Sequence, residues 1–362
     1  MQPAREPMAW NMNVADATRN DPQGDHAMKK ILLYEYLSAN GNANGCVSED
    51  LRMQGRTMRD AVARDLARCG DVALTCVAGH DEARDAMPTT LASDWCFAPF
   101  AIPPTRFLAA EARRHDAVWV IAPETRGVLG ALCDAVDPER WIGCDAATLR
   151  IASSKRATAR HLALAGIATP RAWSADAPLD VARDASAWVV KPDDGAGCVD
   201  TCRFDDYRLA EYAFRRRSAA QERVTLEEWI DGDALSLSLL CSYGHAQLLG
   251  INRQHIGIDE GQISYEGLTA NVIPLSGDND EKAETCRALA TRVARALPGL
   301  AGFVGIDLVW HPQRGPVVIE INPRVTCAYP ALADSVDVNM AACLIAEHFA
   351  SVGNVNGRRH AA

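Results

Sequence analysis

The first third of the chain alternates short apolar runs with one longer periodic segment. A helix over residues 48–69 is indicated by apolar side chains at helical spacing before a glycine, namely Leu51, Met58, Val62 and Leu66. Strands are indicated by three short apolar runs, at residues 29–37, 72–78 and 117–122. Strands that alternate with helices predict a small parallel α/β sheet. The Asn- and Gly-rich residues 38–45 are interpreted equally well as a substrate-holding loop at a strand end or as a plain surface turn.

The pattern changes near residue 147, where a helix and then a series of strands follow. Lys155 lies at the start of a helix that Gly166 ends. Residues 186–192 form an apolar run that ends in Lys-Pro, the Gly-rich residues 193–198 follow, and residues 199–204 are interpreted as a returning strand. Further strands are predicted at 234–241 and 246–251, and helices at 283–297 and 338–349.

Two apolar runs in the C-terminal third flank a turn with a proline and a glycine, which predicts a β-hairpin over residues 302–324. Polar side chains interrupt both runs, Asp307 in the first and Glu320 and Asn322 in the second. Period-two alternation places Glu320 and Asn322 on one face. Buried oxygens without a positive partner are costly, and two carboxylates with an amide oxygen suit Mg²⁺ beside nucleotide phosphates. The alternative is a half-buried hairpin with incidental polar residues.

The composition is that of an acidic globular protein. The 362 residues are 48% apolar and 23% charged, which is enough for two or three domains with their own cores. A net charge of −10 argues against a general nucleic-acid binder, and no apolar run approaches the length of a membrane span. Residues 1–27 lack the apolar stretch of a signal peptide and are interpreted as a disordered extension. The twelve cysteines are then expected to be reduced thiols in the cytoplasm.

Two lysines are candidates for an anion site. Lys155 lies in the first turn of its helix, where the helix dipole disfavours a cation, so an anion facing it is expected, with a solvated lysine as the alternative. Lys191 ends its strand just before Gly195 and Gly197, and backbone N–H groups of such a loop can cap phosphates. No Gly-Lys-Ser/Thr follows, so this is not a Walker loop. A simple hairpin turn would explain the two glycines alone.

An acidic pair followed by an apolar pair indicates an adenine slot at Glu227, Glu228, Trp229 and Ile230. A carboxylate and the backbone would bind the amino group of adenine, while the apolar pair would enclose its ring. A plain core segment explains the same residues equally well. Arg253 follows another predicted strand and is a candidate clamp for a phosphate or carboxylate, or equally a surface arginine.

Taken in order, these pieces resemble the ATP-grasp superfamily over about residues 145–350. The order is a lysine before a helix, a lysine before Gly-X-Gly, Glu-Glu-Trp-Ile, and then an aspartate followed by Glu-X-Asn-Pro-Arg. The resemblance implies a small N-terminal parallel α/β (pre-ATP-grasp) domain followed by a two-subdomain ATP-grasp fold. It implies an N-terminal domain at 28–145, an ATP-grasp domain at 146–350 with its lid subdomain at about 150–230, and a tail at 351–362.

The resemblance also implies bound ATP with Mg²⁺ (or Mn²⁺). The implied ATP-binding residues are Lys155, Lys191, Gly195, Gly197, Glu227, Glu228, Trp229, Ile230 and Asp231, and the implied metal ligands are Asp307, Glu320 and Asn322. Two positions depart from the family pattern. Gly305 stands where many family ligases carry an arginine, and Asp233 stands close to where many carry a ribose-binding glutamate. We therefore expect Arg253 or Arg324 to act as the catalytic arginine, and Asp231 or Asp233 to contact the ribose.

At a finer level, the chain is similar to the tyramine–glutamate ligases of methanofuran-type cofactor biosynthesis. The similarity is carried by residues 31–36 with the Gly-rich loop after them, and by Asn252-Arg253-Gln254 and Tyr265-Glu266-Gly267. It implies an ATP-dependent carboxylate–amine ligase that joins glutamate to a tyramine-like amine through an acyl phosphate, in one-carbon metabolism. The alternatives are another amino-acid or dipeptide ligase of the superfamily, and an ATP-binding regulatory protein without turnover. The expected partners are small molecules, not nucleic acid or a membrane, and a homodimer is left open.

Overall fold

The computed structural model describes residues 28–40, 48–79, 92, 94–173, 185–195, 197–275 and 281–359. The predicted extension at residues 1–27, most of the Asn- and Gly-rich loop and the last residues of the predicted tail lie outside the described residues. Within the described part, the chain is organised around one sheet of five strands and one of nine.

The five-stranded sheet is parallel throughout and has the order β3-β2-β1-β4-β5. Its strands are β1 (Lys29–Glu35), β2 (Val72–Ala78), β3 (Asp94–Phe97), β4 (Ala117–Ile121) and β5 (Trp141–Ile142). The helices of this region are α2 (Tyr36–Asn40), α3 (Glu49–Ala67), α4 (Pro104–Ala112), the single 3₁₀ turn η2 (Thr125–Gly127) and α5 (Val128–Asp134). The sheet confirms the small parallel α/β unit that the alternating pattern predicted.

The first strand ends earlier than the pattern predicted, because Glu35 starts a helix. Its carboxylate accepts hydrogen bonds from the backbone N–H groups of Leu37 (3.1 Å) and Ser38 (2.6 Å) and so caps α2. The carboxylate is buried, and burial raises its pKa above the ordinary value. Gly55 on α3 passes so close that a Cβ at that position would lie 2.6 Å from this carboxylate, which explains a glycine inside the helix.

The nine-stranded sheet is antiparallel and has the order β14-β13-β10-β11-β12-β8-β7-β9-β6. Its strands are β6 (Ala172–Trp173), β7 (Trp188–Pro192), β8 (Cys202–Phe204), β9 (Val224–Glu228), β10 (Asp233–Ser242), β11 (His245–Asp259), β12 (Gln262–Thr269), β13 (Gly302–His311) and β14 (Gly315–Asn322). The helices of this region are α6 (Ala146–Ala152), α7 (Lys155–Leu164), α8 (Tyr207–Ala219), α9 (Glu281–Ala296), α10 (Ala328–Ala333) and α11 (Met340–Arg359). The hairpin predicted from the two C-terminal apolar runs is present as β13 and β14.

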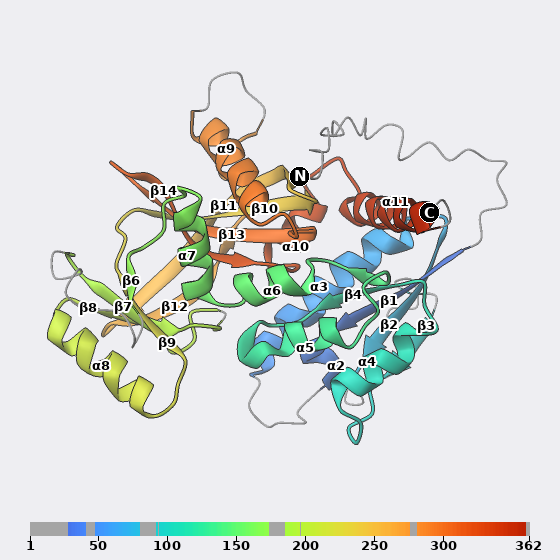
Figure 1. Cartoon of the computed structure of the whole chain (residues 1–362), viewed down its shortest axis with the longest axis horizontal. Helices are drawn as coiled ribbons and strands as arrows, with labels where there is room; N and C mark the ends of the chain where they lie inside the picture. The colour runs from blue at the N-terminus through green and yellow to red at the C-terminus, as the bar shows by residue number, and fades with distance from the viewer. Residues whose placement is uncertain are drawn as a thin grey trace.

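Three apolar clusters hold these parts together. Two large ones each combine residues of the five-stranded sheet with residues of the nine-stranded one, so the two sheets share their cores. The third is separate and lies between α8 and strands β7 and β9; it consists of Trp188, Val190, Ala210, Phe214, Val224 and Leu226. We call β7, β8, β9 and α8 the small lobe, which Figure 1 shows at the left, away from the five-stranded sheet. A lobe with its own core can move as one body.

The curl of the nine-stranded sheet brings its two ends together. Arg314, in the turn between β13 and β14, donates to the carboxylate of Glu228 on β9 at 3.2 Å. The backbone N–H of Val318 on β14 donates to the carbonyl of Ala168 at 2.9 Å. Strands that are far apart in the sheet order therefore face each other, which places β14 opposite the small lobe.

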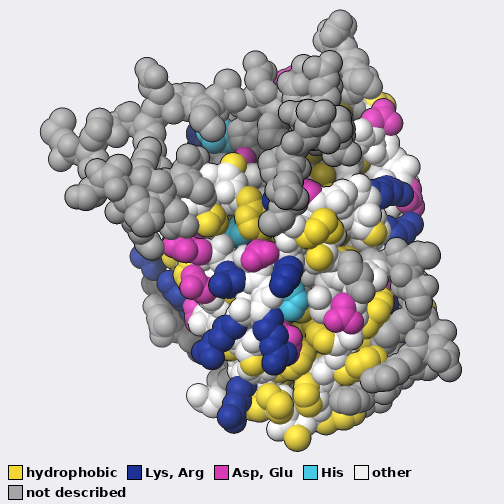
Figure 2. All heavy atoms as spheres, turned by 90° about the vertical axis from the view of Figure 1, so that its right-hand side faces the viewer, with side chains coloured by type: hydrophobic (Ala, Val, Ile, Leu, Met, Phe, Trp, Pro, Cys, Tyr) yellow, Lys and Arg dark blue, Asp and Glu magenta, His cyan; other side chains and the backbone are white. Residues whose placement is uncertain are grey.

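The molecular surface carries charges of both signs. Figure 2, which shows the face at the right of Figure 1, has basic and acidic side chains intermixed across the middle of that face. Among the ion pairs of the described residues is that of Lys29 and Asp71, with 2.7 Å between ammonium and carboxylate. Among the described helices, none has the length and apolar character that crossing a membrane requires.

Candidate active site

Lys155 lies at the start of α7 and points toward the second strand of the C-terminal hairpin. Its ammonium donates to Oε2 of Glu320 at 2.9 Å and also to the backbone carbonyl of Gly195. Ser154 caps the helix by accepting a hydrogen bond from the N–H of Ala157. Burial alone would lower the pKa of Lys155, but the carboxylate of Glu320 raises it above the ordinary value, so the lysine stays charged. The structure therefore brings one predicted lysine against one predicted metal ligand.

Lys191 ends β7 and forms an ion pair with Glu227 on the neighbouring strand β9. The two charged groups lie 2.7 Å apart, and their side chains are only 7% and 5% exposed. Val189 pairs with Glu227 in the register of the two strands, so Lys191, two residues along, lies on the same face as Glu227. Removing either partner would leave a buried charge unpaired, which is strongly destabilising.

The hairpin brings the three predicted metal ligands together. Asp307 faces Glu320 across β13 and β14, and the amide of Asn322 donates to Oδ2 of Asp307 at 3.1 Å. Gln254 on β11 also hydrogen-bonds to Asp307. Burial and the charge of Glu320 raise the pKa of Asp307 well above the ordinary value. Burial would also raise the pKa of Glu320, but the two lysines of the site lower it below the ordinary value.

This donor set fits a magnesium ion. Two carboxylates held side by side repel each other, and a divalent cation between them would relieve that repulsion. Carboxylate and amide oxygens are the hard donors that Mg²⁺ prefers. In the described part of the chain, no group of three or more His, Cys, Asp or Glu side chains is arranged so that it could hold a metal ion. The set of two carboxylates and an amide would therefore leave coordination positions for phosphate oxygens and water.

Asp193 connects the two lysines, and the sequence analysis gave it no role. It is 3% exposed, and its carboxylate accepts hydrogen bonds from the hydroxyl of Ser154 (2.8 Å), the backbone N–H of Arg156 (2.9 Å) and the guanidinium of Arg223 (3.0 Å). Its backbone carbonyl accepts the N–H of Lys155 at 2.9 Å. Asp193 thus fixes the start of α7 against the end of β7. Its place directly after Lys-Pro was the only sequence signal.

Glu228 lies apart from the predicted adenine set. Neighbouring residues of a strand point to opposite faces, so Glu228 points away from the face that carries Glu227. The guanidinium of Arg171 donates to Oε2 of Glu228 at 2.7 Å, and Arg314 donates to Oε1. The carboxylate thereby joins β9 to the turn between β13 and β14. We therefore exclude Glu228 from the proposed adenine contacts.

The residues that follow β9 remain candidates for the nucleotide contacts, together with Glu227. Ile230 is buried, and the indole N–H of Trp229 donates to Oδ1 of Asp231 at 2.7 Å. Asp233, the other ribose candidate, instead pairs with Arg253 and lies 3.8 Å from the ammonium of Lys282 on α9. Of the two, Asp231 is therefore the candidate for the ribose contact.

Arg253 lies on the wrong face of the sheet for the role that the sequence suggested. It pairs in register with Leu235, which belongs to the core beneath α9. Asp307 instead pairs with Ser236, the next residue along, so its side chain points to the opposite face. The guanidinium of Arg253 is half exposed and 3.5 Å from Asp233. This placement argues against the phosphate clamp.

Arg324 is the better placed of the two candidate arginines. It lies two residues after the end of β14, and its guanidinium donates to Oε2 of Glu124 at 2.9 Å, with side chains only 12% and 7% exposed. The charges of Glu124 and Glu320 raise the pKa of Arg324 against the effect of its burial. Arg324 therefore lies beside the carboxylate centre, held by a residue that follows β4 of the other sheet. The sequence analysis did not consider Glu124.

Replacing Arg253 with alanine is expected to change the turnover number by no more than about twofold, because an exposed ion pair on the far face contributes little. The measurement is steady-state phosphate release with saturating ATP. Arg324→Ala in the same assay is the matched comparison and is expected to lose most of the activity. A loss of about a hundredfold or more in the Arg253 variant would return this arginine to the mechanism.

Comparisons with known proteins agree with this architecture. Residues 152–328 match the model of the ATP-grasp domain, and residues 84–149 match that of the pre ATP-grasp 3 domain. Over 218 residues the chain is 25% identical to a D-alanine–D-alanine ligase of Synechococcus sp., covering 57% of this chain and 66% of that ligase, just under two thirds of its length. An ATP-grasp superfamily protein from Archaeoglobus fulgidus superposes with a TM-score of 0.63 at 20% identity and covers 88% of each chain. An L-amino acid ligase from Bacillus licheniformis superposes with a TM-score of 0.64 at 17% identity, covering 89% of this chain and 74% of that one.

These findings confirm the predicted fold and match both of its predicted domains. The two structural matches show the fold, and the two domain models meet almost end to end at the point where the five-stranded sheet gives way to the nine-stranded one. The chain thus contains an ATP-grasp domain at residues 152–328, with a pre-ATP-grasp domain ahead of it at residues 84–149.

Proposed function

We propose that this protein joins a carboxylate to an amine at the expense of ATP, through an acyl phosphate, and that glutamate and a tyramine-like amine are its substrates. The observation that carries the proposal is the convergence of two groups of opposite charge. Lys155 and Lys191 come from α7 and β7, and Asp307, Glu320 and Asn322 come from the hairpin opposite them. A Mg²⁺–nucleotide needs both groups, cations for its phosphates and oxygen ligands for its metal.

The lysines would hold the phosphates of ATP. In the described conformation their ammonium groups are paired with Glu320 and Glu227, so each buried lysine has an acidic partner. Mg²⁺, when bound, would neutralise charge on the transferring phosphoryl group. Glu227 and the backbone near Ile230 would bind adenine, and Asp231 would bind the ribose.

The reaction follows from these positions in two steps. An oxygen of the substrate carboxylate attacks the γ-phosphorus, ADP leaves, and Arg324 with the two lysines stabilises charge on the phosphoryl group. The amine nitrogen then attacks the acyl carbon, phosphate leaves, and the nitrogen gives up a proton. Closing the Gly195–Gly197 loop would exclude water, which would otherwise hydrolyse the acyl phosphate.

The choice of substrates is supported by the motif similarity to tyramine–glutamate ligases. The likeness to a D-alanine–D-alanine ligase favours a second candidate, in which the attacking amine belongs to an amino acid. Both candidates share the site and the acyl phosphate, and they differ only in the amine.

The proposal predicts phosphate release from Mg-ATP that depends on glutamate and tyramine together. Mass spectrometry of the product should give the mass of glutamyl-tyramine, and omission of either substrate should remove it. Release with an amino acid in place of tyramine would favour the second candidate. ATP binding without release across a panel of amino acids and amines would instead identify a regulatory ATP-binding protein and contradict the ligase proposal.

A further inference from the structure

The five-stranded sheet changes direction between β1 and β4. From β1 the chain builds outward through β2 and β3, and it then returns to add β4 and β5 on the other side of β1. Such a switch point leaves a crevice outside the carboxyl ends of the two central strands, where open α/β sheets bind ligands. The register pairs Glu35 with Ile121, so the segments after β1 and β4 begin side by side. The first supplies Tyr36 and the second supplies Glu124.

Glu124 has one carboxylate oxygen without a donor. Oε2 accepts the guanidinium of Arg324, whereas Oε1 is buried and no described residue donates to it. A buried charged oxygen that lacks a donor is costly, so a ligand N–H is expected to donate a hydrogen bond to it. Arg324, which holds the other oxygen of Glu124, is two residues after Asn322, so Glu124 lies next to the end of the strand that carries two of the proposed metal ligands. An amine bound by Oε1 would thus be near the phosphate end of the site.

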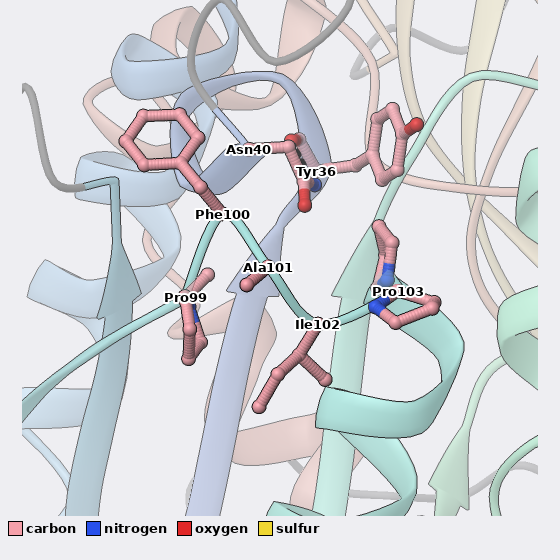
Figure 3. Close-up of a pocket in the computed structure, with 9 residues that line it drawn as sticks. Tyr36, Asn40, Pro99, Phe100, Ala101, Ile102 and Pro103 are labelled. Carbon is pink, nitrogen blue, oxygen red and sulfur yellow. Dashed lines mark hydrogen bonds between the residues drawn. The ribbon is translucent and has the colours of Figure 1, made fainter.

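The segment after β1 also borders a pocket. Its volume is about 290 Å³, and it is lined by Tyr36 and Asn40 from α2 and by the segment 98–104 that leads from β3 into α4. Figure 3 shows the ring of Tyr36 to one side and Phe100 and Ile102 around the hollow. The hydroxyl of Tyr36 points away from the other labelled residues (Figure 3).

The lining of the pocket suits one aromatic ring. Phe100 and Ile102 are large apolar side chains that are 59% and 41% exposed, so a bound ring would shield them from water. Three prolines complete the lining, at 99, 103 and 104, and their fixed backbone preforms its shape. The volume is at the small end for ligand pockets, which fits a single ring and not a larger group.

We propose that the amine substrate binds at this switch point, with its ammonium on Oε1 of Glu124 and an aromatic ring in the pocket between Tyr36 and Phe100. The inference rests on the proposed function, which requires an amine, and it names the groups that select it. The ammonium supplies both the N–H donors and the positive charge that a carboxylate binds best. Tyr36 connects the pocket with the segment that carries Glu124. It borders the pocket, and it directly follows β1, the strand that pairs with β4.

The test is a calorimetric titration of the full-length protein with tyramine, in the presence of Mg²⁺ and a non-hydrolysable ATP analogue. Glu124→Gln is expected to weaken tyramine binding at least about tenfold, because a neutral amide replaces the carboxylate that would bind the tyramine ammonium. Phe100→Ala is expected to weaken tyramine binding by about tenfold through lost ring contact, and its exposed position makes misfolding no concern. Glu222→Gln, another glutamate paired with an arginine but in the connection between α8 and β9, is the matched control and should bind as the unchanged protein does.

The control ligand 2-phenylethanol keeps the ring but lacks the ammonium, so its binding should respond to Phe100→Ala and not to Glu124→Gln. Equal tyramine affinity in the Glu124 variant and the unchanged protein would overturn the inference, as would the absence of tyramine binding to the unchanged protein. The proposed function is tested separately by trapping the acyl phosphate with hydroxylamine, which needs neither the pocket nor Glu124 for recognition. Hydroxamate without tyramine binding would leave the ligase and remove this amine site.

Discussion

Glutamine in place of Glu320 is expected to lower the turnover number by about a hundred- to a thousandfold, the usual cost of removing one preorganised charge that stabilises a transition state. Glu320 is the group on which the charges of the site converge. Its carboxylate accepts a hydrogen bond from the ammonium of Lys155 at 2.9 Å and faces Asp307 across the hairpin. The charges of Lys155 and Lys191 lower its pKa. Glutamine keeps the shape and one oxygen, but it removes the negative charge that would hold Mg²⁺.

The measurement is phosphate release at saturating ATP and glutamate over a range of Mg²⁺ concentrations. The variant should need more Mg²⁺ and should not recover full turnover even when Mg²⁺ saturates it. Glu284→Gln, on the exposed side of α9 where Glu284 pairs with Arg287, is the control and should behave as the unchanged protein. Turnover of Glu320→Gln within about tenfold of the unchanged protein would contradict its assignment as a metal ligand.

Alanine in place of Asp193 is expected both to destabilise the fold and to raise the KM for ATP. The substitution leaves three donors without an acceptor, from Ser154, Arg156 and Arg223. The loss should be about 1–3 kcal/mol in the free energy of unfolding, measured in urea. Because Asp193 ties the start of α7 to the end of β7, both lysines should lose their fixed positions, and the KM for ATP should rise by about tenfold or more.

Two further variants of the chain sharpen this prediction. Asn at position 193 keeps one acceptor oxygen and should recover part of the stability and of the ATP affinity. Ala at the neighbouring Asp194 removes only the hydrogen bond from the N–H of Arg126 and should have a much smaller effect on both quantities. The positioning role of Asp193 would be disproved by equal KM values for ATP in the Asp193→Ala and Asp194→Ala proteins.

The parts of the candidate site whose placement could be predicted from the sequence are those in which strand periodicity alone decides the geometry. Glu320 and Asn322 are two residues apart on one strand, so alternation puts them on one face whatever the fold. Lys191 ends an apolar run before a glycine loop, and both features are local. The same rule, applied to Glu227 and Glu228, shows that adjacent strand residues cannot both face adenine. The structure assigns the second to the contact with Arg171 and Arg314.

The parts that the sequence left open depend on contacts between distant segments. The face on which Arg253 lies follows from its register against Leu235, which no local pattern encodes. Glu124 meets Arg324 although 200 positions separate them. Asp193 acts through Ser154 and Arg223, which come from other elements. Long-range pairing of this kind is decided by the packing of the whole fold.

The secondary structure shows the same division. The long helix α3 and the strands β2, β13 and β14 carry strong periodic patterns and lie close to where the sequence placed them. The short elements β3, β5 and β6, and the antiparallel strand β12, escaped prediction. Their few residues are fixed by pairing with neighbours: β12, for example, lies between β11 and β8 and connects the small lobe to the rest of the sheet.

The central claim is that a carboxylate becomes an acyl phosphate in the site between Lys155, Lys191 and Glu320. The most direct test supplies glutamate with ¹⁸O in its carboxylates, together with Mg-ATP and tyramine, and measures the mass of the released phosphate. An acyl phosphate transfers one carboxylate oxygen to phosphorus, so the account predicts one ¹⁸O in each phosphate released. Amide formation with unlabelled phosphate would contradict it, because the oxygen would then have come from water and no acyl phosphate would have formed.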